Sequence, residues 1–247
     1  MSFPLEILES ILSHLPVDER FRIAVHLRCL RTRDLCIPHL RSASLDNASK
    51  RNLVGLLDWW KGSGLELTWT TNAVDVASTL GHIDVLNWWK DSGLELKWTC
   101  RAMDRASREG YVNVLKWWKD SGLELKWSCA AMTHASFNGH TGVLDWWRDS
   151  GLELEWTFMA LNEASARGHV NVLNWWKDSG LELKWTSDAM DQASARGHVD
   201  VLSWWKDSGL ELKWTTYALR VASEENNDDI LTWWKDSGLE LRTDVKH

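Results

Sequence analysis

The sequence is poor in proline, cysteine and long apolar runs, and each shortage excludes a class of protein. Its 247 residues include only 3 prolines and 4 cysteines, which excludes a collagen-like chain and a small scaffold held by disulfides. No run of about 18 apolar residues is present to span a membrane. The segment Met1–Glu6 has no basic flank and no apolar core follows it, so we expect no signal peptide and no membrane partner.

The four cysteines do not form a disulfide framework. Cys100 and Cys129 lie 29 residues apart at equivalent positions of a repeat, and stacked helices lie roughly 8–10 Å apart, which is too far for a disulfide. Cys29 and Cys36 have no second pair of ligands nearby, so we expect no zinc site. Reduced thiols favour the cytoplasm, with the nucleus as an alternative.

Positive charge is also in deficit, because 28 lysines and arginines face 35 aspartates and glutamates, for a net charge of −7. The negative excess lies in residues 51–247. An acidic surface repels phosphate backbones, so we expect no nucleic-acid partner.

Tryptophan, by contrast, is abundant, and its positions define a repeat. Adjacent pairs begin at residues 59, 88, 117, 146, 175, 204 and 233, always 29 apart, and single tryptophans recur at 69, 98, 127, 156, 185 and 214. These two series account for all 20 tryptophans. The abundance is therefore a property of a repeat architecture rather than of one site.

Each unit predicts two short helices and an extended connector. In the unit that begins at Thr186, the hydroxyl is a candidate N-cap, and Gly197 ends the first helix by adopting the left-handed conformation. A second helix covers residues 199–208 and ends at Gly209. The alternation of residues 210–214 predicts an extended segment. Stacked pairs of this kind make an all-α solenoid.

The two tryptophans of a pair are predicted to differ in burial. At about 100° per residue, Trp205 falls in the middle of the apolar arc of its helix and Trp204 at the edge. We therefore expect the second tryptophan of each pair in the core and the first partly exposed.

The unit resembles the ankyrin repeat. The matching residues are Ala193, Gly197-His198, Val201-Leu202, Trp204-Trp205 and Gly209. The period is 29 rather than about 33, and the family's Thr-Pro-Leu-His opening reads Asp188-Ala189-Met190-Asp191. The resemblance implies seven stacked helix-turn-helix, ankyrin-like repeats over residues 41–247, of which the first and last are degenerate, and a non-enzymatic role in protein–protein interaction.

Residues 1–40 lack the repeat and resemble an F-box. Their first apolar helix follows the order Pro-x-Glu-Ile-Leu, with an acidic turn and a second apolar helix after it. The resemblance implies a substrate receptor of a cullin-RING ubiquitin ligase, in which the Skp-type adaptor would contact Pro4, Leu5, Ile7, Leu8, Ile11 and Leu12. The family's usual tryptophan after the second helix is missing. The alternative is a pair of capping helices that cover the exposed core of the first repeat.

Residue types that carry chemistry recur once per unit and form no single constellation. Four histidines follow the turn glycine, namely His82, His140, His169 and His198, and we expect them to bond to backbone rather than to share a metal. Paired carboxylates recur in nearly every unit, and no phosphate-binding loop or nucleophile elbow is present. We expect no catalytic residue, no metal and no cofactor.

Specificity is predicted to lie on the variable face of the first helices. In ankyrin-like arrays this face lines the concave groove. The alternative explanation of its variation is neutral drift of a solvated helix face. The predicted partner-binding residues are Arg101, Asp104, Arg105, Arg108, His134, Phe137, Met159, Asn162, Glu163, Asp188, Gln192, Tyr217 and Arg220. The three arginines of residues 101–108 form a basic end, while Phe137, Met159 and Tyr217 are candidate anchors, because aromatic residues and arginine dominate interaction hot spots.

The same repeat is also compatible with a second function. The first tryptophan of each pair, spaced every 29 residues, would offer stacking platforms for sugar rings in a carbohydrate-binding module. Packing between repeats is a sufficient role for these side chains.

Overall fold

The computed structural model describes residues 44–63 and 67–239. The predicted F-box-like or capping segment 1–40 lies outside these ranges. All regular elements in the described ranges are helices, and they fall into two units, Met1–Ala102 and Met103–His247.

The helices follow the predicted alternation of a first and a second helix. In residues Met1–Ala102 they are α4 (Leu45–Lys50), α5 (Val54–Ser63), α6 (Asn72–Thr79) and α7 (Ile83–Asp91), and α8 (Arg101–Arg108) begins at the boundary. In Met103–His247 they are α9 (Val112–Asp120), α10 (Ala130–Phe137), α11 (Thr141–Asp149), α12 (Met159–Ala166), α13 (Val170–Asp178), α14 (Asp188–Ala195), α15 (Val199–Asp207), α16 (Thr216–Glu224) and α17 (Asp228–Asp236). The α-solenoid prediction is confirmed.

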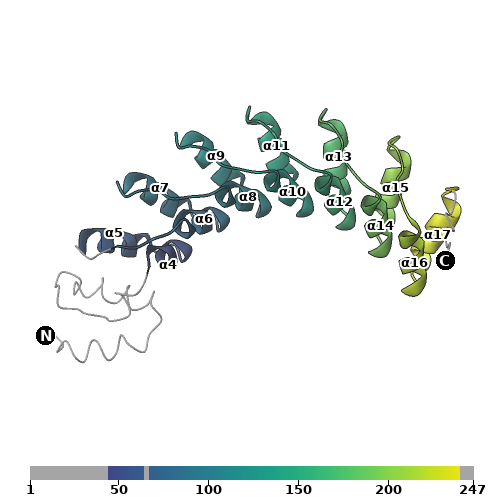
Figure 1. Cartoon of the computed structure of the whole chain (residues 1–247), viewed down its shortest axis with the longest axis horizontal. Coiled ribbons are helices and arrows are strands. Elements are labelled where there is room, and N and C mark those ends of the chain that lie inside the picture. Colours follow the sequence, from purple (N-terminus) through teal and green to yellow (C-terminus); the bar gives the residue numbers. More distant parts are fainter. Residues whose placement is uncertain (1–43, 64–66, 240–247) are drawn as a thin grey trace, which may run out of the picture. The chain divides into compact units, whose positions relative to one another are not determined.

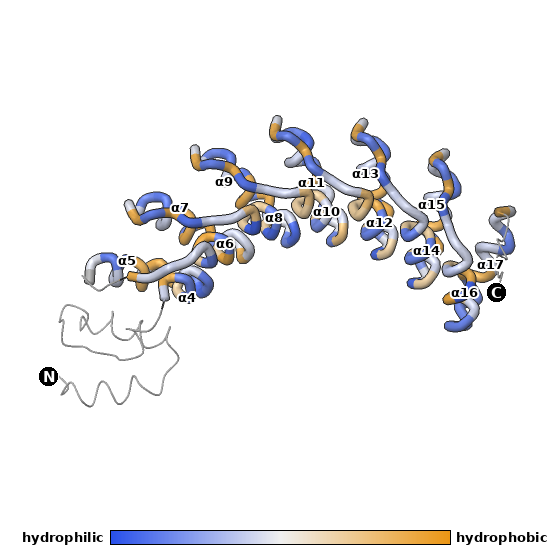
Figure 2. Tube along the Cα trace, viewed as in Figure 1, coloured by the Kyte–Doolittle hydropathy of each residue, from blue (hydrophilic) through white to orange (hydrophobic). Residues whose placement is uncertain are grey.

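Within residues 103–247 the helices form two rows. The first helices α10, α12, α14 and α16 pack directly on one another, while the second helices α11, α13, α15 and α17 contact their neighbours less extensively. Figure 1 shows the first helices on the inner side of this unit's curve, and Figure 2 shows apolar residues where the two rows meet. The closer packing of one row than of the other accounts for the curvature.

The turn between the two helices of a repeat has the predicted conformation. Gly197 has φ of 78°, and Asn226, which replaces the glycine in the last repeat, has φ of 53°. The glycine also makes room for the next repeat, because a Cβ at Gly168 would lie 2.9 Å from Nδ1 of His198. His169 bonds through Nε2 to the carbonyl oxygen of Phe137, 3.1 Å away. His82 bonds in the same way to the carbonyl oxygen of Lys50, so the predicted backbone bond is present at these two turn histidines. The rings of His140 and His198 pack against the turn glycines Gly110 and Gly168 of the preceding repeats.

The second tryptophan of each pair is the centre of the core. Its exposed fraction is 2% or less at all seven positions. Its indole N–H donates to a serine of the preceding repeat's first helix, as in Trp176 to Ser136 at 2.9 Å and Trp205 to Ser165 at 3.0 Å. This bond satisfies the one polar group that the buried indole carries.

The first tryptophan of each pair is more buried than predicted at two positions. Trp88 and Trp175 have exposed fractions of only 8% and 9%, while the other five are half-buried. The six pairs from Trp88–Trp89 to Trp233–Trp234 meet edge to face, as between Trp175 and Trp176, whose ring centroids are 5.2 Å apart. The preceding second helix covers the outer face more fully than the arc of one helix indicates.

The connectors run extended but do not form strands. The connector tryptophan packs at a tilt against the core tryptophan of the next repeat, with 5.9 Å between the ring centroids of Trp156 and Trp176 and 42° between their planes. Its N–H donates to the next connector, in this case to the carbonyl oxygen of Glu182 at 3.0 Å. All three tryptophans of a unit therefore contact a neighbouring repeat.

Removal of a core serine is expected to destabilise the array. Ser136→Ala leaves the buried N–H of Trp176 without an acceptor, so we expect the free energy of unfolding to fall by about 1–3 kcal/mol. Urea denaturation followed by far-UV circular dichroism measures this change.

Ser223→Ala is the matched control. Ser223 occupies the equivalent position of α16, is exposed, and accepts no indole N–H among the described residues. We expect a change within about 0.5 kcal/mol. Equal effects of the two substitutions would contradict the role assigned to the tryptophan–serine bond.

Candidate functional site

The candidate site is the exposed side of the first helices, which we call the first-helix face. Of the predicted residues, the structure leaves six exposed on residues 103–247, namely Arg105, Arg108, Met159, Asp188, Tyr217 and Arg220, and Arg101 is exposed at the start of α8. His134, Phe137, Glu163 and Gln192 are half-buried. Asp104 and Asn162 are buried.

Large apolar side chains are exposed on this face. Met159 is 45% exposed at the first turn of α12 and Tyr217 is 37% exposed at the first turn of α16. Phe158 is not among the predicted residues, yet it is 46% exposed. Its signal was available, because the equivalent positions of the other units carry Thr71, Cys100, Cys129, Ser187 and Thr216.

Phe137 does not stand free as an anchor. The guanidinium of Arg167, from the next repeat, lies over its ring at 4.1 Å from the centroid. Its carbonyl oxygen also accepts from His169. The side chain therefore contributes to the contact between two repeats and presents only part of its ring to solvent.

The prediction that Asp104 and Asn162 face solvent is wrong. Their exposed fractions are 5% and 7%, and those of the equivalent Asp75 and Asp191 are both 3%. The arc of a single helix places this position opposite the core. In the structure, the first residue of the next repeat covers it, as Ser128 does for Asp104.

The buried acidic position links each repeat to the next, and we call this contact the aspartate latch. The carboxylate of Asp191 accepts from the backbone N–H of Thr215 at 2.8 Å and from its hydroxyl at 2.6 Å. The Thr215 hydroxyl in turn accepts from the N–H of Tyr217, as predicted for an N-cap. Asn162 likewise accepts from the backbone N–H of Thr186 at 3.1 Å, but its amide donates to the Thr186 hydroxyl at 2.7 Å where the carboxylate of Asp191 accepts.

One repeat lacks this latch. Thr133 occupies the position in α10, and its hydroxyl is buried with no hydrogen-bond partner in the described part of the chain. The equivalent of Thr215 here is Thr157, which begins the next repeat and caps α12 by accepting from the N–H of Met159 at 3.3 Å. The repeats on either side of Thr157 are therefore joined without the carboxylate contact.

The basic end of the face includes a histidine of low basicity. Burial lowers the pKa of His134, and the nearby Arg108 and Arg105 lower it further, while Asp104 raises it. His134 is therefore neutral at pH 7, and the positive charge comes from the arginines of α8.

Other kinds of site receive little support from the described residues. Residues 44–63 and 67–239 hold no group of three or more metal-ligating side chains. Over the same ranges, no helix has the length and apolar character needed to cross a bilayer. Cys100 and Cys129 remain thiols.

The tryptophans do not form open platforms for sugar rings. The outer tryptophans Trp88, Trp175, Trp204 and Trp233 meet their core neighbours edge to face. The indole N–H of each donates to the preceding second helix, as in Trp204 to Asn174 at 2.7 Å. The geometry does not favour the carbohydrate-binding alternative.

Comparison with known proteins identifies the fold. No protein-family model matches the sequence, and no curated protein matches it. The ankyrin repeat domain of human ASB11 matches with a TM-score of 0.58 and 16% identity, over 77% of this chain and 97% of that one. Identity at this level indicates a shared fold alone.

Two structures of the pentatricopeptide repeat protein PPR10 in complex with an 18-nt psaJ RNA element also match. Each has a TM-score of 0.35 and 13% identity, over 94% of this chain and 38% of that one. A TM-score this low carries no argument about this chain. The described repeats form an ankyrin-like solenoid, as the sequence predicts.

The latch is expected to make stability depend on pH. Burial raises the pKa of Asp191 above the ordinary value of 3.8, against the opposing hydrogen bonds from Thr215. In the unfolded chain this carboxyl ionises first, so the free energy of unfolding falls as the pH rises from 3.8 through the higher folded-state pKa. Asp191→Asn should remove this component while keeping the contacts that Asn162 makes.

Denaturant unfolding at a series of pH values from about 3.5 to 7 tests the sign of this effect. Asp207→Asn, at an exposed position of α15, is the matched control. Its free energy of unfolding should vary with pH as that of the wild type does. An unchanged profile in Asp191→Asn would show that the buried carboxyl does not contribute.

Proposed function

We propose that this chain is a non-enzymatic scaffold that binds a protein partner on its first-helix face. The observation that carries the proposal is the position of its exposed large apolar side chains. In the described ranges these are Leu80, Phe158, Met159 and Tyr217, and each lies in a first helix or at its end. Exposed aromatic and apolar side chains of this kind supply the energetic centre of protein interfaces.

The arrangement of charge supports a protein partner. Arg105 and Arg108 are exposed on α8, while Asp188 is exposed on α14. Tyr217 lies beside Arg220, whose guanidinium is 5.3 Å from the ring centroid. Apolar anchors flanked by charges of both signs favour a folded or extended protein ligand over an anion of one charge.

The non-enzymatic part of the proposal is supported by the contacts of the titratable residues, which form hydrogen bonds between repeats. The aspartate of the latch accepts hydrogen bonds from the next repeat, and turn histidines such as His82 bond to a carbonyl oxygen of the preceding one. Both groups serve the stacking of repeats.

The first-helix proposal is tested by partner recovery. Met159→Glu combined with Tyr217→Glu places charge on the two exposed anchors, and we expect recovery of a partner from host lysate to fall by at least about 30-fold, equivalent to about 2 kcal/mol. Thermal unfolding should stay unchanged, because both side chains are exposed.

Lys177→Glu is the control variant, because Lys177 is exposed on α13 of the second-helix row. It should recover the partner as the wild type does. Equal recovery by the Met159 and Tyr217 variant would reject the first-helix face as the binding surface.

We also propose that residues 1–40 recruit the Skp-type adaptor of a cullin-RING ubiquitin ligase, which would make the scaffold a substrate receptor in the cytoplasm or nucleus. The support is the resemblance of Pro4, Leu5, Ile7, Leu8, Ile11 and Leu12 to the F-box pattern. The capping interpretation of the same helices predicts no adaptor.

Adaptor binding is tested by co-purification. The full chain should recover a Skp-type adaptor, and Leu8→Asp with Ile11→Asp should abolish recovery, because a carboxylate in an apolar interface is costly to desolvate. Glu9→Ala, between the two changed positions, is the control. If the full chain recovers no adaptor, the capping interpretation is preferred.

A further inference from the structure

A groove between the second helices α9 and α11 contains two hydrogen-bond donors, an indole N–H and an ammonium group, that have no acceptor among the described residues. Its lining includes Val112, Lys116, Lys119, Gly142 and Trp146. Neighbouring second helices contact one another here, so the groove is built within residues 103–247. It lies on the second-helix row and is therefore separate from the first-helix face.

At other junctions between second helices, the indole N–H of the outer tryptophan has an acceptor within the chain. The indole N–H donates to an oxygen of the preceding second helix, and the residue that accepts lies 30 positions earlier. The observed bonds are Trp88 to Asp58 at 2.7 Å, Trp175 to Asp145 at 2.8 Å, Trp204 to Asn174 at 2.7 Å and Trp233 to Ser203 at 2.9 Å. This position normally supplies an acceptor.

At Trp146 the acceptor is replaced by a cation. The residue 30 positions earlier is Lys116, whose ammonium group only donates. Neither the Trp146 N–H nor the Lys116 ammonium has a hydrogen-bond or ion-pair partner among residues 44–63 and 67–239. The groove therefore presents a neutral donor and a positive charge. At the four junctions named above, the same two positions form a hydrogen bond with each other.

Gly142 opens the same groove. The equivalent positions carry Asp84, Asn113, Asn171, Asp200 and Asp229 in five other units and a second glycine, Gly55, in the first unit, so within residues 103–247 only α11 lacks a side chain there. A Cβ at Gly142 would meet nothing within 4 Å. The glycine leaves room for an incoming side chain beside Trp146.

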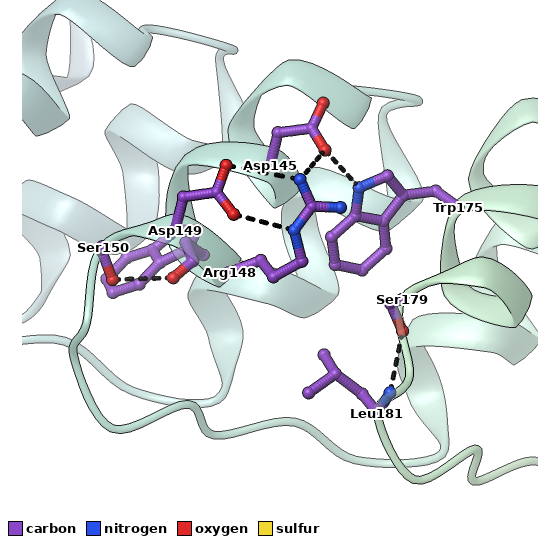
Figure 3. Close-up of polar contacts among 8 residues, drawn as sticks. Asp145, Arg148, Asp149, Ser150, Trp175, Ser179 and Leu181 are labelled. Atoms are coloured by element: carbon purple, nitrogen blue, oxygen red, sulfur yellow. Dashed lines mark hydrogen bonds and ion pairs between the residues drawn. The ribbon is translucent and has the colours of Figure 1, made fainter.

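At the next junction, between α11 and α13, the position equivalent to Lys116 is occupied by the acceptor Asp145. In Figure 3 the Asp145 carboxylate receives the Trp175 N–H and also Arg148, whose Nη2 lies 3.0 Å from it. Arg148 lies over the Trp175 ring, 5.8 Å from its centroid, and pairs with Asp149 at 2.9 Å. A carboxylate held between an indole N–H and a cation is thus already present in this fold.

We propose that the groove between α9 and α11 binds a glutamate or aspartate side chain of an acidic partner peptide. The carboxylate accepts from Nε1 of Trp146 and pairs with Nζ of Lys116, so it combines an indole donor and a cation as Asp145 does with Trp175 and Arg148, although here the cation stands at the position that Asp145 occupies in the next repeat. A single negative charge fits better than a phosphate dianion, because Asp120, Asp145 and Asp149 line the same groove. Lys119 is held at one end by the carbonyl oxygen of Ser150 at 2.8 Å.

The indole N–H signals of the ¹⁵N-labelled full chain test the proposal. The Trp146 signal is assigned by its loss in Trp146→Phe. A blocked peptide with one glutamate among alanines should shift this signal selectively and saturably, with a dissociation constant on the order of 1 mM for a single charge-assisted contact. The glutamine version of the peptide should leave it unmoved.

Lys116→Asn is the decisive variant. Asn174 accepts the N–H of Trp204 at the equivalent position, so this substitution is compatible with the fold and should close the site. We expect the affinity for the glutamate peptide to fall by at least about tenfold. Lys177→Asn, at an exposed position of α13, should bind as the wild type does.

The results that overturn the proposal are specific. They are an unmoved Trp146 signal, an equal response to the glutamine peptide, or unchanged affinity in Lys116→Asn. A stronger response to inorganic phosphate than to the glutamate peptide would assign the groove to a different anion. The outcome is independent of the first-helix proposal, because neither Met159 nor Tyr217 lines this groove.

Discussion

A hydrogen bond from a buried indole N–H to a serine of the preceding repeat sets the register in which the repeats stack. A tryptophan brings a large apolar surface and one polar group that is costly to bury without a partner. Trp205 finds its partner only in Ser165, 40 residues earlier. A repeat therefore completes its core only when another precedes it in the correct register, and the array is stabilised through neighbour contacts.

The other recurring residues are consistent with the same register. The aspartate latch joins Asp191 to Thr215, and the ring of His198 fills the space that Gly168 leaves. Because these contacts occupy the tryptophans, serines, aspartates and histidines, the surfaces left for a partner are the first-helix face and the grooves between second helices. Function is then expected where a unit departs from the shared pattern.

Three departures cluster in the repeats around α10 and α11. Thr133 lacks the carboxylate of the latch, Lys116 lacks the oxygen that other outer tryptophans bond to, and Arg148 replaces a lysine and adds contacts to Trp175. The first removes a link to the next repeat and the last supplies one between α11 and α13. The stacking of repeats thus tolerates loss at one point where another contact compensates.

The helix pairs, the left-handed turns and the core tryptophans could be predicted from the residues alone, because a 29-residue period and the arc of one helix depend only on local geometry. The exposure of Met159 and Tyr217 was predicted correctly as well. The burial of Asp104 and Asn162, the contact of Arg167 with Phe137, and the shared groove of Lys116 and Trp146 became visible only in the folded repeats. Each of these depends on what the adjacent repeat places against a helix, and the periodicity of one helix does not contain that information.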